Sequence, residues 1–364
     1  MTTSTIDALI DKELEELRGG EKVTKKAAKK RAPKKEEPLF SKKKEPSGDA
    51  PKGTKKYSEL FGAVPPTGTD WDVPVYARED WGENEEFIPA VNDDYVFDHS
   101  TLEPLIISYI KNLKTLTVGP TGCGKTSVVE QIAARINQPY LRINGRADMD
   151  SDTLLGRPWV TDGSMDFMLG EMPKAAQAGF LIAFDEPWKT PSGIQMALQR
   201  FYERDGAFQL DDMPGDLADK IIHSDPRCRM FLSDNVVGTG DGAAQYGATL
   251  IQDGSTLNRM DVVIKMGYLS AKDEALLIKK AHPTLTDALA SRMVKTFNLI
   301  RTNVDQGELS AAVSPRNLLT WADLAIELGD EKIAFIWSVL GRYSLPEELG
   351  TVKEHYRTVF GASL

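Results

Sequence analysis

The sequence feature that most constrains the fold is an eight-residue stretch, GPTGCGKT at 119–126, which fits the pattern G-x-x-x-x-G-K-[ST]. An apolar run at 113–118 precedes it and predicts a strand, and TSVVEQIAARIN follows it and predicts a helix. In such an arrangement glycines let backbone N–H groups approach phosphate oxygens, and the helix N-terminus adds positive potential. We therefore expect a phosphate-binding loop made of Gly119, Pro120, Thr121, Gly122, Cys123, Gly124, Lys125 and Thr126.

Two side chains of this loop have specific expected roles. Lys125 would reach the β- and γ-phosphates of a nucleoside triphosphate such as ATP, and Thr126 would bind Mg²⁺. The alternative is a glycine-rich turn that binds nothing. Cys123 is interpreted as a small loop residue rather than as a redox thiol.

A pair of carboxylates, Asp185 and Glu186, directly follows the apolar run at 179–184. If that run is a buried strand, the pair lies at the carboxyl edge of the sheet, where open α/β sheets bind their ligands. Asp185 would hold Mg²⁺ through water, and Glu186 would polarise the attacking water as a general base. An Asp-Glu pair is also a common way to begin a loop, and it is the phosphate-binding loop upstream that favours the functional interpretation.

Three further polar residues are candidates for the same reaction. Asn235 follows a predicted strand, where its amide could orient the water against the γ-phosphate, although surface turns also favour Asn. Arg259 precedes a predicted strand and suits a finger donated to a neighbour's nucleotide; the alternative is a surface salt bridge. Arg316 follows a Ser-Pro helix start, where it could contact phosphate and sense hydrolysis, or simply be solvated.

The order of predicted elements indicates an α/β fold over residues 96–269. Apolar runs alternate with helical patterns, which is typical of a parallel sheet covered on both faces by helices. After residue 270 the predicted strands stop, so that residues 270–364 are expected to form an all-helical lid domain. The expected strands are 113–118, 139–144, 179–184, 228–233 and 262–266, and the expected lid helices are 271–281, 284–303, 315–328, 330–341 and 347–358.

Three segments are expected before this α/β domain. Residues 1–20 place apolar residues at helical spacing and predict an amphipathic helix, and residues 21–56 are predicted to be a disordered Lys-rich linker. Residues 57–95 are acidic and turn-rich but hold aromatic residues, which indicate a strap lying against the body. Residues 22–56 carry fourteen Lys and Arg against four Asp and Glu, whereas the whole chain has a net charge of −10. The acidic body argues against broad nucleic-acid binding.

Composition excludes several classes of protein. No run of 18 uncharged apolar residues is present, and the acidic first residues do not form a signal or transit peptide, so we expect a cytoplasmic protein with no membrane association. Two cysteines and four scattered histidines offer neither a disulfide framework nor metal-ligand spacing.

Together these residues resemble the AAA+ ATPases, and within them the CobS type, the smaller AAA+ subunit of aerobic cobaltochelatase, near the MoxR group. The resemblance spans roughly residues 90–362. The stretches that carry it are DDYVFD (93–98), GPTGCGKT, AFDEPWKTPSGIQMALQRFYERDG (183–206), FLSDNVVGTGDGAAQYGAT (231–249), LNRMD (257–261), SPRNLLTWAD (314–323) and HYRTVFG (355–361).

The resemblance implies roles for individual residues. Lys125 and Thr126 would be Walker A, Asp185 and Glu186 Walker B, Asn235 sensor 1, Arg259 a finger acting in trans, and Arg316 sensor 2. It further implies a homo-oligomer, a hexameric ring, with hairpin inserts at 160–168 and 207–223 that face the pore. It also implies a partner subunit with a von Willebrand A-type domain and a large chelatase or client subunit.

The expected function is an ATP-hydrolysing ring motor that uses ATP and Mg²⁺ and drives metal insertion into a tetrapyrrole by a separate catalytic subunit. A MoxR-like chaperone that remodels another protein, one that could be encoded by a phage, is the alternative. A nucleic-acid-associated ATPase that uses the Lys-rich segment is the less favoured alternative. The Lys-rich segment and its leading helix depart from the usual pattern of the family.

Overall fold

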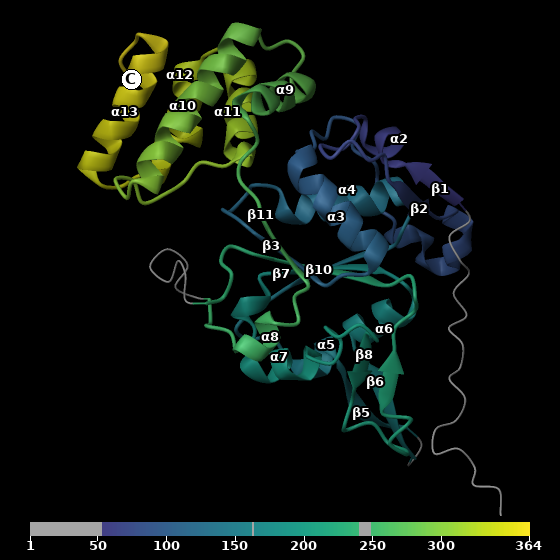
Figure 1. Ribbon diagram of the computed structural model, residues 1–364. Coiled ribbons are helices and arrows are strands. Elements are labelled where there is room, and N and C mark those ends of the chain that lie inside the picture. Colours follow the sequence, from purple (N-terminus) through teal and green to yellow (C-terminus); the bar gives the residue numbers. More distant parts are fainter. Residues whose placement is uncertain (1–52, 162–163, 240–248) are drawn as a thin grey trace, which may run out of the picture. The chain divides into compact units, whose positions relative to one another are not determined.

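The computed structural model describes residues 53–161, 164–239 and 249–364, and its centre is a five-stranded parallel sheet (Figure 1). The predicted amphipathic helix 1–20 and the predicted linker up to residue 52 lie outside the described residues. The strands are β3 (Thr115–Val118), β4 (Tyr140–Asn144), β7 (Leu181–Asp185), β10 (Arg229–Asp234) and β11 (Val262–Lys265), and their order in the sheet is β11-β3-β10-β7-β4. The predicted parallel sheet is thereby confirmed. Three strands lie inside their expected ranges, whereas β7 and β10 each end one residue later than expected, at Asp185 and Asp234.

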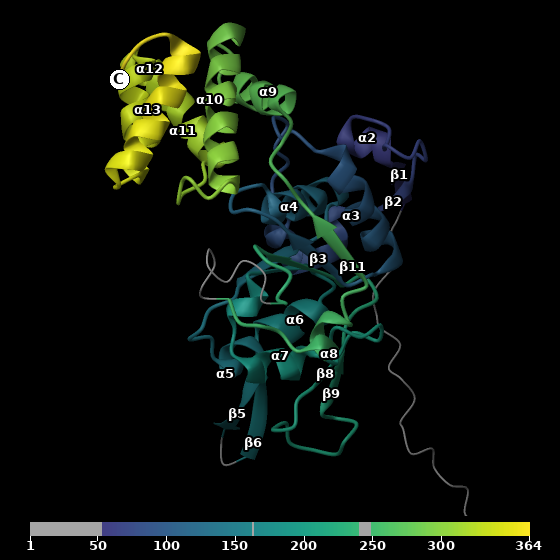
Figure 2. The same ribbon diagram turned by 60° about the vertical axis from the view of Figure 1, so that its left-hand side comes forward.

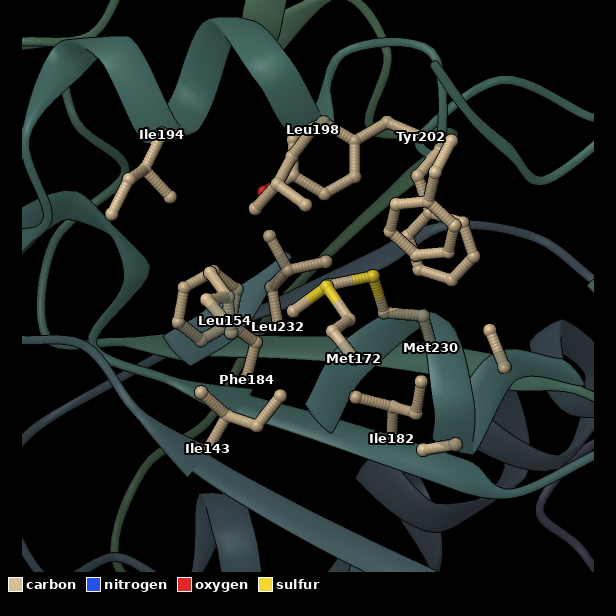
Figure 3. Packing of buried hydrophobic residues seen from close by; sticks show 14 of the residues in the cluster. Ile143, Leu154, Met172, Ile182, Phe184, Ile194, Leu198, Tyr202, Met230 and Leu232 are labelled. Carbon is tan, nitrogen blue, oxygen red and sulfur yellow. The ribbon is translucent and has the colours of Figure 1, made fainter. Parts of the chain in front are cut away.

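The central strands are buried on both faces because successive side chains of a strand point to opposite sides. In β7, Ile182 and Phe184 pack into one core cluster, whereas Leu181 and Ala183 pack into another on the other face. Figure 3 shows Ile182, Phe184, Met230 and Leu232 of the first cluster beside Met172 and Leu198. A continuous apolar run is what such a strand requires.

Helices cover both faces of the sheet. α3 (His99–Lys111) and α4 (Lys125–Ile136) belong to the cluster that contains Leu181, and α6 (Glu171–Gln177) and α7 (Ser192–Leu198) to the cluster that contains Ile182. The short elements α5 (Ser151–Leu154), η2 (Pro187–Lys189) and α8 (Gly254–Leu257) lie in the connections.

Residues after β11 form helices only, with a core cluster of their own (Figure 2). These are α9 (Ala271–Ala281), α10 (Asp287–Asp305), α11 (Pro315–Leu328), α12 (Glu331–Ser338), η3 (Leu340–Arg342) and α13 (Pro346–Phe360). Trp321 of α11 is fully buried at the centre, where its ring contacts Phe297, Phe335 and Tyr356.

The residues before α3 lie against the body. They comprise β1 (Gly53–Lys56), α2 (Tyr57–Phe61), β2 (Asp72–Val75) and η1 (Arg78–Phe87). Trp81 donates a hydrogen bond from Nε1 to the Asn137 carbonyl at 2.7 Å, and Trp71 donates one from Nε1 to Glu103 at 3.0 Å. The aromatic side chains therefore fix this segment to α4 and α3.

The predicted end of the linker at residue 56 is wrong by four residues, because Gly53–Lys56 is a strand paired antiparallel with β2. All four residues of β1 are exposed, so the strand carries no apolar pattern that sequence reasoning could detect. Its pairing with β2 consists of backbone hydrogen bonds and one exposed ion pair, between Lys56 and Asp72 at 2.9 Å.

Two antiparallel hairpins are inserted in the connections between strands of the central sheet, one between β4 and β7 and one between β7 and β10. β5 (Gly156–Thr161) pairs with β6 (Ser164–Leu169), and β8 (Ala207–Gln209) pairs with β9 (Ile221–His223). The β8–β9 hairpin has the bounds of the insert expected at 207–223, whereas the β5–β6 hairpin, from 156 to 169, extends beyond the insert expected at 160–168. In the part of the chain that the structure describes, no helix has the length and apolar character needed to cross a bilayer.

Candidate functional site

The phosphate-binding loop connects β3 to α4 at the carboxyl edge of the sheet. Lys125 is buried and donates hydrogen bonds from Nζ to the carbonyl oxygens of Gly119 at 2.8 Å and Pro120 at 3.1 Å. The same ammonium donates to Oδ1 of Asn235 at 2.9 Å. Its charge is therefore held at the centre of the loop, where a phosphate would be expected.

The shape of the loop depends on glycine at two positions. Gly122 has φ +79° and Gly124 has φ +98°, which are left-handed conformations that L side chains rarely adopt. Gly124 is also the N-cap of α4, so the first N–H groups of that helix point into the loop. Cys123 is buried, and burial raises the pKa of its thiol, as expected for a packing residue rather than a reactive thiol.

The side chain of Asp185 meets groups from three other elements. Thr126 donates from Oγ1 to Oδ2 at 3.0 Å, and Ser233 donates from Oγ to Oδ1 at 2.7 Å. Arg142 of β4 forms an ion pair with the same carboxylate. Thr126 and Asp185 thus present a hydroxyl and a carboxylate oxygen side by side.

This donor set fits Mg²⁺, because Mg²⁺ prefers hydroxyl, carboxylate and water oxygens. A second observation supports the fit: a cationic side chain, Arg142, is bound to the Asp185 carboxylate. Thr126 and Asp185 would hold the ion, which would supply charge neutralisation for the phosphates. Among the described residues there is no separate group of three or more His, Cys, Asp or Glu that could hold a metal.

Glu186 lies between an amide and an ammonium. Asn235 donates from Nδ2 to Oε1 at 3.2 Å, and Lys189 donates from Nζ to Oε2 at 2.7 Å. The backbone of Glu186 is left-handed, with φ +53°, and its N–H donates to the Ser233 carbonyl at 2.7 Å. The turn directs the Glu186 side chain toward Asn235 and so toward Lys125.

Arg259 lies outside this group. Its guanidinium donates to Glu203 at 3.3 Å and to the Ser255 carbonyl at 2.8 Å. With Arg200 it lines a surface hollow of about 510 Å³. The chain therefore does not bring Arg259 to its own phosphate loop. The ion pair with Glu203 is the surface salt bridge that was one of the two interpretations of Arg259 in the sequence.

Arg316 is exposed at the second position of α11. In the described part of the chain its guanidinium has no hydrogen-bond or ion-pair partner. The start of α11 nevertheless lies against the phosphate loop, because a Cβ added to Gly122 would stand 2.5 Å from Cβ of Ser314. A capping box formed by Ser314 and Asn317 fixes this helix start.

Sequence reasoning missed four polar residues of the site. Arg142 and Lys189 form ion pairs with the two candidate carboxylates, and Ser233 and Asp234 precede Asn235 on β10. An Arg inside the apolar run 139–144 and a Lys three residues after Glu186 were available signals. The contact of Arg142 depends on the pairing of β4 with β7, whereas the ion pair of Lys189 with Glu186 is local.

Comparison with known proteins shows what the part of the chain that contains the phosphate-binding loop, Asp185 and Glu186 is similar to. The sequence profile of the AAA domain, dynein-related subfamily, matches residues 114–216. The α/β body has the AAA+ P-loop fold. The aerobic cobaltochelatase subunit CobS of Sinorhizobium sp. is 29% identical over 327 residues, which are 86% of this chain and 92% of that protein. The similarity to the CobS type that the motifs indicated is thereby confirmed.

Two other matches share less with this chain. Midasin of Dictyostelium discoideum is 27% identical over 179 residues, which are 46% of this chain and 3% of that protein. Among solved structures, the Thermotoga maritima RuvB Holliday junction branch migration motor superposes with a TM-score of 0.43 at 14% identity, covering 72% of this chain and 74% of that one.

Proposed function

We propose that this chain hydrolyses ATP with Mg²⁺ as one subunit of a hexameric cytoplasmic ring, and that the ring is the motor of a cobaltochelatase-like complex. The observation that carries the proposal is the convergence of Lys125, Asp185, Glu186 and Asn235 at one sheet edge beside a phosphate-binding loop. Each of these side chains is within hydrogen-bond distance of another residue of the site. A structural ion-pair network would not need the glycine-rich loop and the helix N-terminus beside it.

In this mechanism the loop N–H groups and Lys125 bind the β- and γ-phosphates. Thr126 and Asp185 would hold Mg²⁺, which would supply neutralisation of the phosphate charge. Glu186 accepts a proton from the attacking water, and Asn235 orients that water against the γ-phosphate. Lys189 and Asn235 each donate to one oxygen of Glu186, and each carboxylate oxygen has a second acceptor site that can receive the proton.

One more cationic side chain, Arg259, would be supplied to each active site by the adjacent subunit. Arg259 and Arg200 line the same surface hollow. Arg259 contacts Glu203 there and does not contact Lys125. We propose that the hollow faces the next subunit and that Arg259 reaches that subunit's γ-phosphate. Arg316, at the capped start of α11, would contact phosphate within its own subunit. Loss of that contact after hydrolysis would change the position of the helical domain.

The described residues offer no ligand cluster that would deliver a metal, so metal insertion would be carried out by another subunit. The similarity to CobS supports a large chelatase subunit and a von Willebrand A-type partner. The test is co-purification from the native host. Recovery of a tetrapyrrole-binding subunit supports the chelatase proposal, and its replacement by an unrelated stoichiometric protein overturns it while leaving the ATPase intact.

Protein remodelling of a MoxR-like kind is a second candidate, and the β5–β6 hairpin favours it. Trp159, Val160 and Met165 are large apolar side chains that remain exposed on this hairpin. Exposed apolar side chains of this kind are typical of protein contacts. Genes for a tetrapyrrole-binding subunit beside this one would distinguish the two candidates.

A further inference from the structure

Asp234 is the last residue of β10 and is fully buried. Its Oδ2 accepts a hydrogen bond from the backbone N–H of Trp188 at 3.2 Å, and its Oδ1 accepts one from the N–H of Asn235 at 2.7 Å. Its carbonyl oxygen accepts from the N–H of Gly119 at 3.2 Å. One residue therefore contacts the phosphate loop, the loop after Glu186 and the candidate sensor residue.

These contacts hold Glu186 on both sides. The N–H of Glu186 donates to Ser233, and the N–H of Trp188, two residues later, donates to Asp234. Between these anchors Glu186 has φ +53°, a strained conformation for a residue other than glycine, which persists only when its surroundings enforce it. Without the Asp234 contact, one of the two anchors of this turn is lost.

The geometry requires a carboxylate. Both oxygens of Asp234 face backbone N–H groups, and an amide at this position would turn an NH₂ group toward one of them. Burial raises the pKa of Asp234 to about 6, the N–H groups of Asn235 and Trp188 oppose the rise, and the charge of Glu186 adds to it. The fold thus keeps a carboxyl group in a buried position that disfavours its charge.

We propose that Asp234 is a positioning residue for ATP hydrolysis: through main-chain hydrogen bonds it holds the Glu186 carboxylate and the Asn235 amide in register with the phosphate loop. Asp234 does not touch the substrate. This inference rests on the proposed ATPase function. The buried Asp234 side chain would align Glu186, the base, with Asn235, which orients the water.

The test compares Asp234→Asn with Asp225→Asn in the full-length chain. Asp225 is the control, because it is a buried carboxyl that precedes the other end of β10, away from Glu186. Its Oδ1 accepts from the N–H of Arg227 at 2.8 Å, and its two oxygens accept from the guanidinium of Arg227 at 2.9 and 3.0 Å. Three quantities are measured: kcat for ATP, the Kd of a fluorescent ATP analogue with Mg²⁺, and amide hydrogen exchange in peptides covering 186–190.

For Asp234→Asn we expect kcat to fall at least about ten-fold while the Kd changes less than about three-fold, since misalignment by a fraction of an ångström impairs chemistry more than binding. We also expect faster exchange in 186–190. Asp225→Asn should leave all three quantities near wild type. If Asp234→Asn does not fold, Asp234→Glu, which keeps both acceptor oxygens but displaces them by a methylene group, is expected to give the same separation of kcat from Kd.

Three results for Asp234→Asn would each overturn the positioning role. They are an unchanged kcat, unchanged hydrogen exchange in 186–190, and a Kd that rises in proportion to the loss of kcat. A wild-type protein that binds the nucleotide without hydrolysing it would contradict the proposed function instead. In that case the exchange measurement still decides whether Asp234 holds the Glu186 turn.

Discussion

Lys125 and Asn235 are hydrogen-bonded side chain to side chain, with Nζ 2.9 Å from Oδ1, although 110 positions separate them in the sequence. The contact exists because β3 and β10 are neighbours in the sheet and the two residues follow the carboxyl ends of those strands. It joins the cation that would bind the γ-phosphate to the amide that would orient the water against it. Two groups that must act on the same phosphate are thus already adjacent.

The first prediction concerns the cation of the loop. Lys125→Met keeps much of the aliphatic stem and removes the ammonium, together with its three hydrogen bonds to Gly119, Pro120 and Asn235. Since a hydrogen bond from a charged donor contributes about 1.5–3 kcal/mol, we expect affinity for MgATP to fall about 10- to 150-fold. Isothermal titration calorimetry measures this change.

Lys111→Met is the control for this substitution, because Lys111 is an exposed lysine at the end of α3. It should bind MgATP as the wild type does. Equal affinities for Lys125→Met and Lys111→Met would contradict the phosphate-binding role of the loop.

Much of the fold follows from the sequence because its central strands are buried on both faces. The side chains of 181–184 in β7 and of 230–232 in β10 pack alternately into one core cluster or the other, so the apolar runs are continuous and visible. β1 could not be predicted, since its exposed residues Gly53–Lys56 are held to β2 by backbone hydrogen bonds. Backbone pairing leaves no signature in side-chain pattern.

The site was predictable where one motif carries its own geometry, and not where it depends on strand order. The P-loop residues have a fixed spacing that glycine conformation and the helix N-terminus require. Arg142, by contrast, reaches Asp185 only because β4 pairs with β7, a contact between residues 43 positions apart. The burial of Asp234 likewise depends on the packing of η2 against β10, which no local pattern specifies.

The second prediction concerns the base. Glu186→Gln keeps the size of the side chain and removes its ability to accept a proton, so MgATP binding should persist while turnover falls by about 10²- to 10⁴-fold. Single-turnover measurements with radiolabelled ATP separate the two steps. Turnover at the wild-type rate would rule out Glu186 as the base.

The third prediction concerns Arg259. Arg259→Ala should bind nucleotide normally and hydrolyse it at least about 10²-fold more slowly, because a finger residue acts on the transition state rather than on binding. When it is mixed with Glu186→Gln subunits, activity should be partly restored, since a Glu186→Gln subunit donates an intact Arg259 to a neighbour whose own Glu186 is intact.

Glu203→Gln is the matched control for Arg259→Ala, because it breaks the Arg259–Glu203 ion pair and retains the arginine. Exposed ion pairs contribute little to stability, so this variant should fold and hydrolyse ATP near the wild-type rate. Equal losses in the two variants would indicate that Arg259 acts through the ion pair within its own subunit. Absence of restoration in rings shown to contain both mutant subunits would also contradict a finger acting in trans.

The fourth prediction concerns the pH dependence of stability at Asp234. Its pKa is about 6 in the folded protein against 3.8 in the reference state, so the folded chain binds the proton more tightly than the unfolded chain. The resulting stabilisation is complete below about pH 4 and is lost as the pH rises through about 6. The variant Asp234→Asn has no group at this position that titrates between about pH 4 and 6.

Between about pH 4.5 and 7.5 the free energy of unfolding of the wild type should therefore fall by about 2 kcal/mol relative to the variant. Urea unfolding of both proteins at the two pH values measures the difference, and a difference that stays constant would show that the carboxyl group is solvated in the folded chain.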